Sequence, residues 1–234
     1  MTEQQLLAAL TEPVSYDPIR YQMAHQLFDN NAIVFNQEIE SDIVETFILP
    51  LLDMEANPNV NKITIYLSTC GGSLFDGFII CNILENLKTP TDLIVLGTAH
   101  SLGAVLLTAG YHNPNVIRKA YPFSVGLLHD GEYAVSGASS KANETVKFYQ
   151  KMSDIMRDYI VSHSRFSLEE LESRWEKEFF MTADEMLEYG LIDEIIGVSK
   201  QSNGVDTNEG NTSTESEANL QKNETNNGNE SEVR

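Results

Sequence analysis

The sequence predicts an α/β fold in which a parallel sheet carries helices on its faces. Three neighbouring features indicate it. Residues 62–67 (KITIYL) form the apolar, β-branched run that is typical of a buried strand. A glycine-containing turn at 68–73 follows, and then apolar side chains recur at helical spacing over 75–87. A second apolar run at 93–96 completes a strand–helix–strand unit, the connection that joins neighbouring parallel strands.

Composition limits the class of protein. The chain has 234 residues, of which 41% are hydrophobic, and this suffices for one domain with a sizeable core. A formal net charge of -20 argues against a nucleic-acid-binding surface. No run of 18 apolar residues is present, and residues 1–20 lack a basic start followed by an apolar run, so we expect neither a membrane span nor a signal peptide. Cys70 and Cys81 indicate neither a disulfide framework nor a zinc site, which predicts a reducing, cytoplasmic setting.

Three segments are expected along the chain. Residues 1–20 form an amino-terminal arm interrupted by Pro13 and Pro18, and residues 21–198 form the folded domain. Residues 199–234 are dominated by Asn, Ser, Thr, Glu and Gly and contain no aromatic residue. Such a segment cannot offset the entropy lost on ordering, and we expect an acidic, disordered tail.

The first elements of the domain follow from periodicity. Residues 32–35 (AIVF) predict a strand, and apolar residues at helical spacing predict a helix over 41–54, ended by the Asn-Pro-Asn sequence at 57–59. In the turn after the next strand, Gly71 and Gly72 permit close backbone approach, so their amides can face a ligand oxygen. An ordinary turn is the alternative, and no phosphate-binding glycine motif is present.

The stretch 95–110 (VLGTAHSLGAVLLTAG) is the candidate centre of the molecule. Its strand is expected to stop at Gly97, and helical spacing begins after Ser101, which places this serine at a strand-to-helix turn. A serine at such an elbow exposes its hydroxyl beside the amides of the helix start, as a nucleophile requires. The alternative is an N-capping serine on a buried helix.

The second half of the domain is predicted in the same way. Gly110 ends the central helix, and residues 111–118 are expected to form a polar loop. A strand over 122–128 delivers His129 at its end, and residues 131–137 are expected to be an exposed hairpin or extended strand. A long helix over 140–163, two shorter helices with capping-box sequences beginning at Ser167 and Thr182, and a final strand over 191–196 complete the list.

Four of these segments, in this order, resemble the proteolytic subunit of the ATP-dependent Clp protease. The turn Ser68-Thr69-Cys70-Gly71-Gly72 resembles that family's Asn-Ser-Pro-Gly-Gly turn, and residues 97–110 resemble its nucleophile segment. Residues 180–185 (FMTADE) and 189–193 (YGLID) are similar to its carboxy-terminal signature. The resemblance spans about residues 32–196.

The resemblance implies a crotonase-like fold of repeated ββα units with a protruding handle helix, and a serine peptidase. It places Ser101 on the nucleophile, His129 on the general base, and the backbone amides of Gly72 and Leu102 on the oxyanion hole. Glu178 falls on the position of the triad acid, where the family commonly has Asp. No metal or other cofactor is implied, and the remaining histidines, including His100, are interpreted as surface or structural.

Departures from the family pattern leave a second hypothesis open. Glu178 replaces the acid, Phe179 replaces an Arg that pairs between rings, and Cys70 replaces the proline of the turn. These departures predict a divergent member of the family, such as a phage-encoded protein or a specialised paralogue.

The first hypothesis is a serine endopeptidase cutting unfolded proteins or peptides inside a heptameric, single or double ring, with an ATP-driven AAA+ unfoldase as partner. The second is a catalytically weak or inactive ring subunit or assembly factor. A hydratase of acyl-CoA thioesters on the same fold is the third; it explains the glycine turn but not why Ser101 and His129 both match a peptidase.

Overall fold

The computed structural model describes residues 26–132 and 135–198, and it confirms the α/β class. The predicted arm and the predicted tail lie outside the described residues. The elements are β1 (Ala32–Phe35), η1 (Val44–Ile48), α3 (Leu49–Ala56), β2 (Ile63–Thr69), α4 (Leu74–Asn86), β3 (Thr91–His100), α5 (Leu102–Thr108), β4 (Val116–Ala120), β5 (Val125–Leu128), α6 (Ser139–Ser162), α7 (Leu168–Trp175), β6 (Phe179–Thr182), α8 (Ala183–Glu188) and β7 (Glu194–Ile195).

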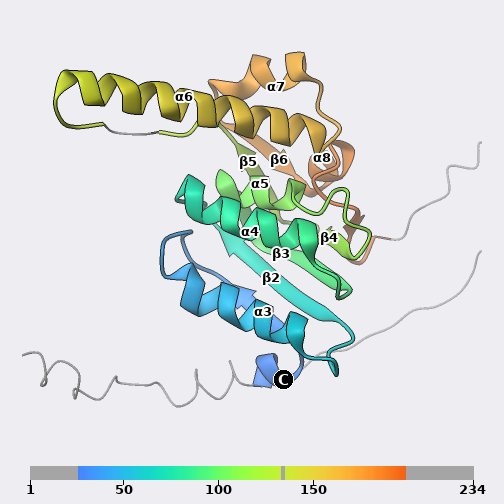
Figure 1. The fold of residues 1–234 in the computed structure, drawn as a ribbon. Helices are drawn as coiled ribbons and strands as arrows, with labels where there is room; N and C mark the ends of the chain where they lie inside the picture. Colours follow the sequence, from blue (N-terminus) through green and yellow to red (C-terminus); the bar gives the residue numbers. More distant parts are fainter. Residues whose placement is uncertain (1–25, 133–134, 199–234) are drawn as a thin grey trace, which may run out of the picture. The chain divides into compact units, whose positions relative to one another are not determined.

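The strands form one sheet with a branch in it. Strands β1, β2, β3, β4 and β7 are neighbours in that order and run parallel, and β5 also runs parallel to β3. β6 pairs with β5 in the antiparallel sense. β3 serves both parts of the sheet, because its first half pairs with β4 and its last three residues pair with β5. Helices α3, α4 and α5 lie along the sheet in Figure 1, and α6 projects beyond it.

The core lies between the sheet and the helices that cover it. Its fully buried side chains come from strands and helices alike, as Ile65, Leu84 and Leu106 illustrate. β2 follows the alternation expected of a strand with one buried face, with every second residue buried. Helix α5 is buried along its whole length rather than along one stripe.

Helix α6 confirms the long helix predicted over 140–163. Its buried side chains are Met156 and Ile160, whereas their neighbour Ile155 is exposed. Phe148, nearer the amino-terminal end, is also exposed, although its ring stacks on that of Phe75 in α4 with centroids 6.2 Å apart. The helix is therefore fully buried only in its carboxy-terminal half, at two positions.

Strand β4 was not predicted, because the segment was interpreted as part of a polar loop. Its buried positions are Val116, Arg118 and Ala120, so a charged residue occupies the centre of the inward face. The Arg118 guanidinium is satisfied by the carboxylate of Asp193, at 2.6 Å and 3.0 Å, and by the carbonyls of Leu107 and Gly190. Because Asp193 neutralises Arg118, this segment forms a strand between β3 and β7 although its sequence resembles that of a polar loop.

Several predicted boundaries were also wrong. The third strand continues past Gly97 to His100, and its pairing with β2 shifts register after Leu67. The helix predicted over 41–54 begins as the π-helical η1 and continues as α3. β6 was not predicted, the final strand has two residues, and the described residues of 131–137 contain no strand.

The capping box predicted at Thr182 is confirmed. The reciprocal hydrogen bonds of a capping box are present at Thr182 and Glu185.

Candidate active site

The branched sheet brings Ser101 and His129 together. Ser101 follows β3 and His129 follows β5, and these two strands are parallel neighbours whose carboxyl ends meet at the same edge. The register pairs His100 with Leu127, and the amide of Ser101 extends the ladder by donating to the Leu127 carbonyl at 2.8 Å. The side chains of Ser101 and His129 therefore leave the ends of two adjacent strands and are offset by one residue along the strand direction.

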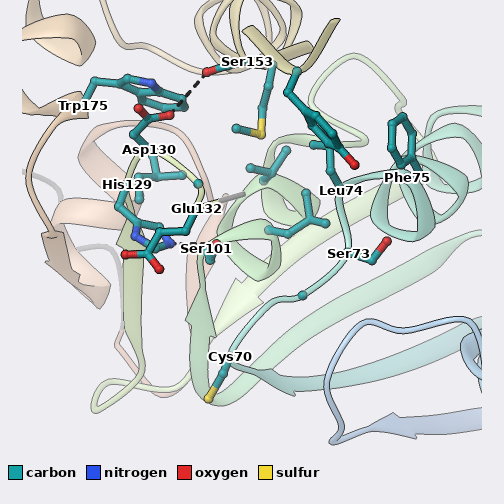
Figure 2. Close-up of a pocket in the computed structure, with 17 residues that line it drawn as sticks. Cys70, Ser73, Leu74, Phe75, Ser101, His129, Asp130, Glu132, Ser153 and Trp175 are labelled. Carbon is teal, nitrogen blue, oxygen red and sulfur yellow. Dashed lines mark hydrogen bonds between the residues drawn. The ribbon is translucent and has the colours of Figure 1, made fainter. Parts of the chain in front are cut away.

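Their side chains form a hydrogen bond. The distance between His129 Nε2 and Ser101 Oγ is 2.8 Å. The Ser101 side chain makes no capping hydrogen bond to helix α5, so the alternative interpretation of this residue as a simple N-capping serine is wrong. In Figure 2 the imidazole and the hydroxyl lie next to each other at the edge of a pocket.

The backbone at Ser101 has the strained conformation of a nucleophile elbow. Its φ of 53° is in the left-handed region, which a residue with a side chain rarely adopts. Such a conformation costs about 1–3 kcal/mol and persists only where the surroundings enforce it. Here β3 enters the turn on one side, and buried helix α5 leaves it on the other. The strain keeps the hydroxyl out of the packed layer and directed at His129.

Gly72 and Leu102, whose backbone amides were predicted to form the oxyanion hole, line the same pocket as Ser101. Around Gly72, Ile39 donates to the Gly71 carbonyl at 2.8 Å and accepts from Ser73 at 2.7 Å. In a parallel bridge of this kind the middle residue directs its own amide to the opposite side, so the Gly72 N–H points away from Ile39. Leu102 is the first residue of α5, and the amide at this position has no partner within its helix. In the described part of the chain neither amide donates to another backbone group.

Glycine is required at both positions of the turn. A Cβ on Gly71 would lie 2.8 Å from Ser101 Cβ and 3.0 Å from the Leu102 nitrogen, which shows how closely the turn approaches Ser101. A Cβ on Gly72 would lie 2.3 Å from the carbonyl oxygen of Ile39. Both residues also have positive φ, at 93° and 147°.

Thr69 holds this turn in place, a role that sequence analysis did not assign. Its hydroxyl donates to the carbonyl of Gln37 at 2.6 Å and accepts from the amide of Gly71 at 3.1 Å. Thr69 is buried at the end of β2, so these hydrogen bonds form away from solvent. The indication in the sequence was a hydroxyl residue two positions before the first glycine, where the family turn also has one.

The pairing of β5 with β6 places Glu178 near His129, but the two side chains form no hydrogen bond with each other in the described part of the chain. The last residue pair of β5 and β6 is Leu128 with Phe179, so the next residues along the two strands are His129 and Glu178. Glu178 is exposed, and no hydrogen bond joins it to His129 among the described residues. The structure thus places the predicted acid beside the base without the hydrogen bond that a catalytic triad has.

His100 belongs to the surroundings of the site, although it was interpreted as surface or structural. Its ring packs edge-on against Phe180, with centroids 6.0 Å apart, and its Nε2 is buried without a hydrogen-bond partner in the part of the chain that is described. Burial lowers the pKa of His100 below its usual 6.5; nearby Glu178 acts against this lowering, and His129 adds to it. His100 therefore interacts electrostatically with both Glu178 and His129.

A pocket of about 540 Å³ opens directly beside the Ser101 hydroxyl. Its floor includes Ser101, Leu102 and Gly72, and His129 lies in one wall. The other lining residues are Cys70, Ser73, Leu74, Phe75, Val105, Leu128, Asp130, Gly131, Glu132, Tyr149, Ser153, Met156 and Trp175. A concave, mostly apolar site with convergent polar groups at one point is the usual form of a substrate site.

Neither a metal centre nor a membrane span is found in the described ranges. No group of three or more His, Cys, Asp or Glu side chains within residues 26–132 and 135–198 is arranged to hold a metal ion. In the same ranges, no helix combines the length and apolar character needed to cross a bilayer.

Comparison with known proteins identifies the family. The Clp protease family model matches residues 16–199, which is most of the chain. An ATP-dependent Clp protease proteolytic subunit of Deinococcus radiodurans is 28% identical over 184 residues, covering 79% of this chain and 89% of that protein. A protein of the same name from Cyanophora paradoxa is 28% identical over 170 residues, covering 73% and 86%. This chain belongs to the Clp protease family and is a serine-type peptidase.

Proposed function

We propose that this peptidase cuts unfolded polypeptides with Ser101 as the nucleophile and His129 as the general base. The single observation that carries this assignment is the 2.8 Å hydrogen bond between His129 Nε2 and Ser101 Oγ at the edge of the pocket. A serine hydroxyl is a poor nucleophile until a neutral imidazole accepts its proton. The strained elbow at Ser101 supports the same assignment.

The amides of Gly72 and Leu102 complete the reaction scheme. As the Ser101 oxygen attacks the substrate carbonyl, negative charge develops on the carbonyl oxygen, and the two amides donate to it. His129, now protonated, gives its proton to the leaving amine, and the acyl-enzyme forms. Water activated by the same imidazole then releases the second product.

Glu178 is the proposed acid of the triad. Its position after the β5–β6 pair makes it the carboxylate that the sheet brings nearest in register to His129. Hydrogen bonds among catalytic groups are often long in the free enzyme and shorten when substrate is bound. We propose that the exposed Glu178 side chain turns onto His129 Nδ1 in this way, where it would stabilise the imidazolium.

The proposed assembly is a heptameric ring working in the cytoplasm with an ATP-driven AAA+ unfoldase. Two relatives are named as the proteolytic subunit of an ATP-dependent protease, and this chain has no phosphate-binding glycine motif of its own. Phe148 and Ile155 are large, exposed apolar side chains of α6, and they are available for contacts between subunits. Phe179 is buried against Phe166 and Tyr189, so contacts between stacked rings would use other residues.

One observation favours the second candidate function, a ring subunit with little catalytic activity. Within the described residues, no carboxylate is hydrogen-bonded to His129, and an unsupported imidazole is a weaker base. Such a subunit would assemble as the family does and hydrolyse peptides slowly.

Serine-probe labelling distinguishes the two functions. The purified chain is treated with a fluorophosphonate, the labelled residue is located by peptide mapping, and the native mass is measured on the same sample. We expect labelling at Ser101, none in Ser101→Ala, and a ring-sized mass for both proteins. Rings without labelling would favour the second function, and labelling at a different serine would refute the assignment of Ser101.

A further inference from the structure

The pocket beside Ser101 is placed to receive one particular substrate side chain. Ser101, Gly72 and Leu102, which contact the scissile carbonyl in the proposed function, are themselves part of its lining. The side chain next to that carbonyl therefore enters this pocket. The inference rests on the proposed function and concerns what the pocket selects.

Most of the pocket surface is apolar. Figure 2 shows Leu74 and Phe75 on the wall opposite His129, and Trp175 on the same side as His129. Val105, Leu128 and Met156 are buried side chains that also face the cavity. These residues suit the methylene groups of a long side chain.

Two carboxylates interrupt this apolar lining, and both lie within three positions after His129 in the sequence. Asp130 and Glu132 lie on the same wall as His129 in Figure 2. Neither lysine nor arginine is found among the described lining residues. Two carboxylates that form no ion pair with any described residue therefore border a mostly apolar pocket.

Asp130 is held in position by its neighbours. Its amide donates to the carbonyl of Trp175 at 2.8 Å, which ties the residue to the end of α7. One carboxylate oxygen accepts from the hydroxyl of Ser153 on α6 at 3.4 Å, and the dashed line in Figure 2 marks this contact. The other oxygen makes no hydrogen bond in the described part of the chain and is available to a ligand.

We propose that Asp130 and Glu132 make this peptidase prefer substrates with lysine or arginine immediately before the scissile bond. The aliphatic stem of such a residue lies on the apolar walls, and its cationic head reaches the carboxylates. Two carboxylates about 6 Å from an ammonium in water-like surroundings correspond to about a tenfold effect on kcat/KM. Because both groups are exposed, the preference weakens as salt is added.

The test compares three fluorogenic peptides that differ only at the residue before the scissile bond. This residue is lysine, norleucine or glutamate; norleucine keeps a four-carbon stem without the charge. For the wild-type chain at low salt we expect kcat/KM for lysine to exceed that for norleucine about tenfold, with glutamate the poorest. Raising the salt concentration should bring the three values together.

Isosteric variants test whether Asp130 and Glu132 cause the preference for lysine. In a double variant carrying Asp130→Asn and Glu132→Gln, the ratio of kcat/KM for lysine to that for norleucine should fall close to one. Glu169→Gln, which removes an exposed carboxylate of α7 outside the pocket lining, is the matched control and should retain the wild-type ratio.

The outcomes separate this inference from the proposed function. Wild-type cleavage of norleucine as fast as lysine at low salt refutes the charge preference and leaves the peptidase assignment intact. A preference that survives in the double variant also refutes it. Cleavage of none of the three peptides overturns the proposed function and the inference together. The comparison on the wild-type chain decides the matter even if the double variant does not fold.

Discussion

The substitution Gly72→Ala tests whether the turn after β2 forms half of the oxyanion hole. A Cβ at this position would lie 2.3 Å from the Ile39 carbonyl oxygen and 2.8 Å from the Ile39 nitrogen. All the close atoms belong to the backbone, so no flexible side chain can move aside. An ordinary Cβ contact begins at 3.4 Å, and the backbone must therefore separate by about 1 Å.

This separation predicts a large effect on catalysis. The displaced residue is the one whose amide is proposed to stabilise the oxyanion, and a 1 Å misplacement costs about a hundredfold in rate. Complete loss of one such donor costs about 10²- to 10³-fold in kcat. We therefore expect kcat for a peptide substrate to fall at least a hundredfold with a smaller change in KM. The positive φ of 147° strains the folded alanine variant and should lower its free energy of unfolding by about 1–3 kcal/mol.

The matched control is Gly97→Ala in β3. Its Cβ would meet only the Ser68 hydroxyl, at 3.6 Å, which is an ordinary contact. This variant should keep near wild-type kinetics and melting temperature. Kinetics of Gly72→Ala within threefold of wild type, in a protein that remains folded, would refute the proposed role of this amide.

Three further outcomes are expected. Glu178→Gln should reduce kcat at least tenfold with no change in melting temperature, and unchanged kinetics would exclude this residue as the triad acid. Asp193→Ala leaves the guanidinium of Arg118, whose side chain is 3% exposed, without its carboxylate. The variant should lose about 3 kcal/mol in urea unfolding, and a loss below 1 kcal/mol would contradict the argument. Hydrogen bonds from the backbone and side chain of Thr182 hold the pKa of Glu185 below its usual 4.5. Its stabilisation is therefore present above pH 4.5 and is lost as the pH falls through the lowered pKa. Because Glu185 is only partly buried, Glu185→Gln should cost about 0.5 kcal/mol at pH 7 and nothing near pH 2, measured by chemical unfolding; a pH-independent cost would contradict it.

Local patterns predicted most of the fold. The strands β1 and β2, predicted over 32–35 and 62–67, and the helices α4, α5 and α6 were predicted from runs and spacings that reflect burial within one element. β4 was missed because its central inward residue is Arg118, whose partner Asp193 lies 75 positions away. No window of the sequence contains both members of that pair, so the segment resembles a solvated loop.

In the candidate site, too, some features were predicted from local sequence patterns and others depend on residues that are distant in sequence. Local patterns placed Ser101 at an elbow and the glycine pair in a turn, and the family resemblance assigned His129, at a strand end, as the general base. The patterns did not reveal that β3 divides its edge between β4 and β5, which is why His129 reaches Ser101. The surroundings of His100, the position of Asp130 and the lack of contact between Glu178 and His129 also depend on strands distant in sequence.

The sequence by itself determined the α/β class, the order of its main elements and the residue types that a serine peptidase requires. Only the tertiary structure decided which of those residues meet, which amides remain free and which charges border the pocket. The physical reason is that secondary structure follows from interactions between residues a few positions apart, whereas hydrogen bonds at a catalytic site depend on strand register and helix packing. Those are set when segments far apart in the chain are buried together.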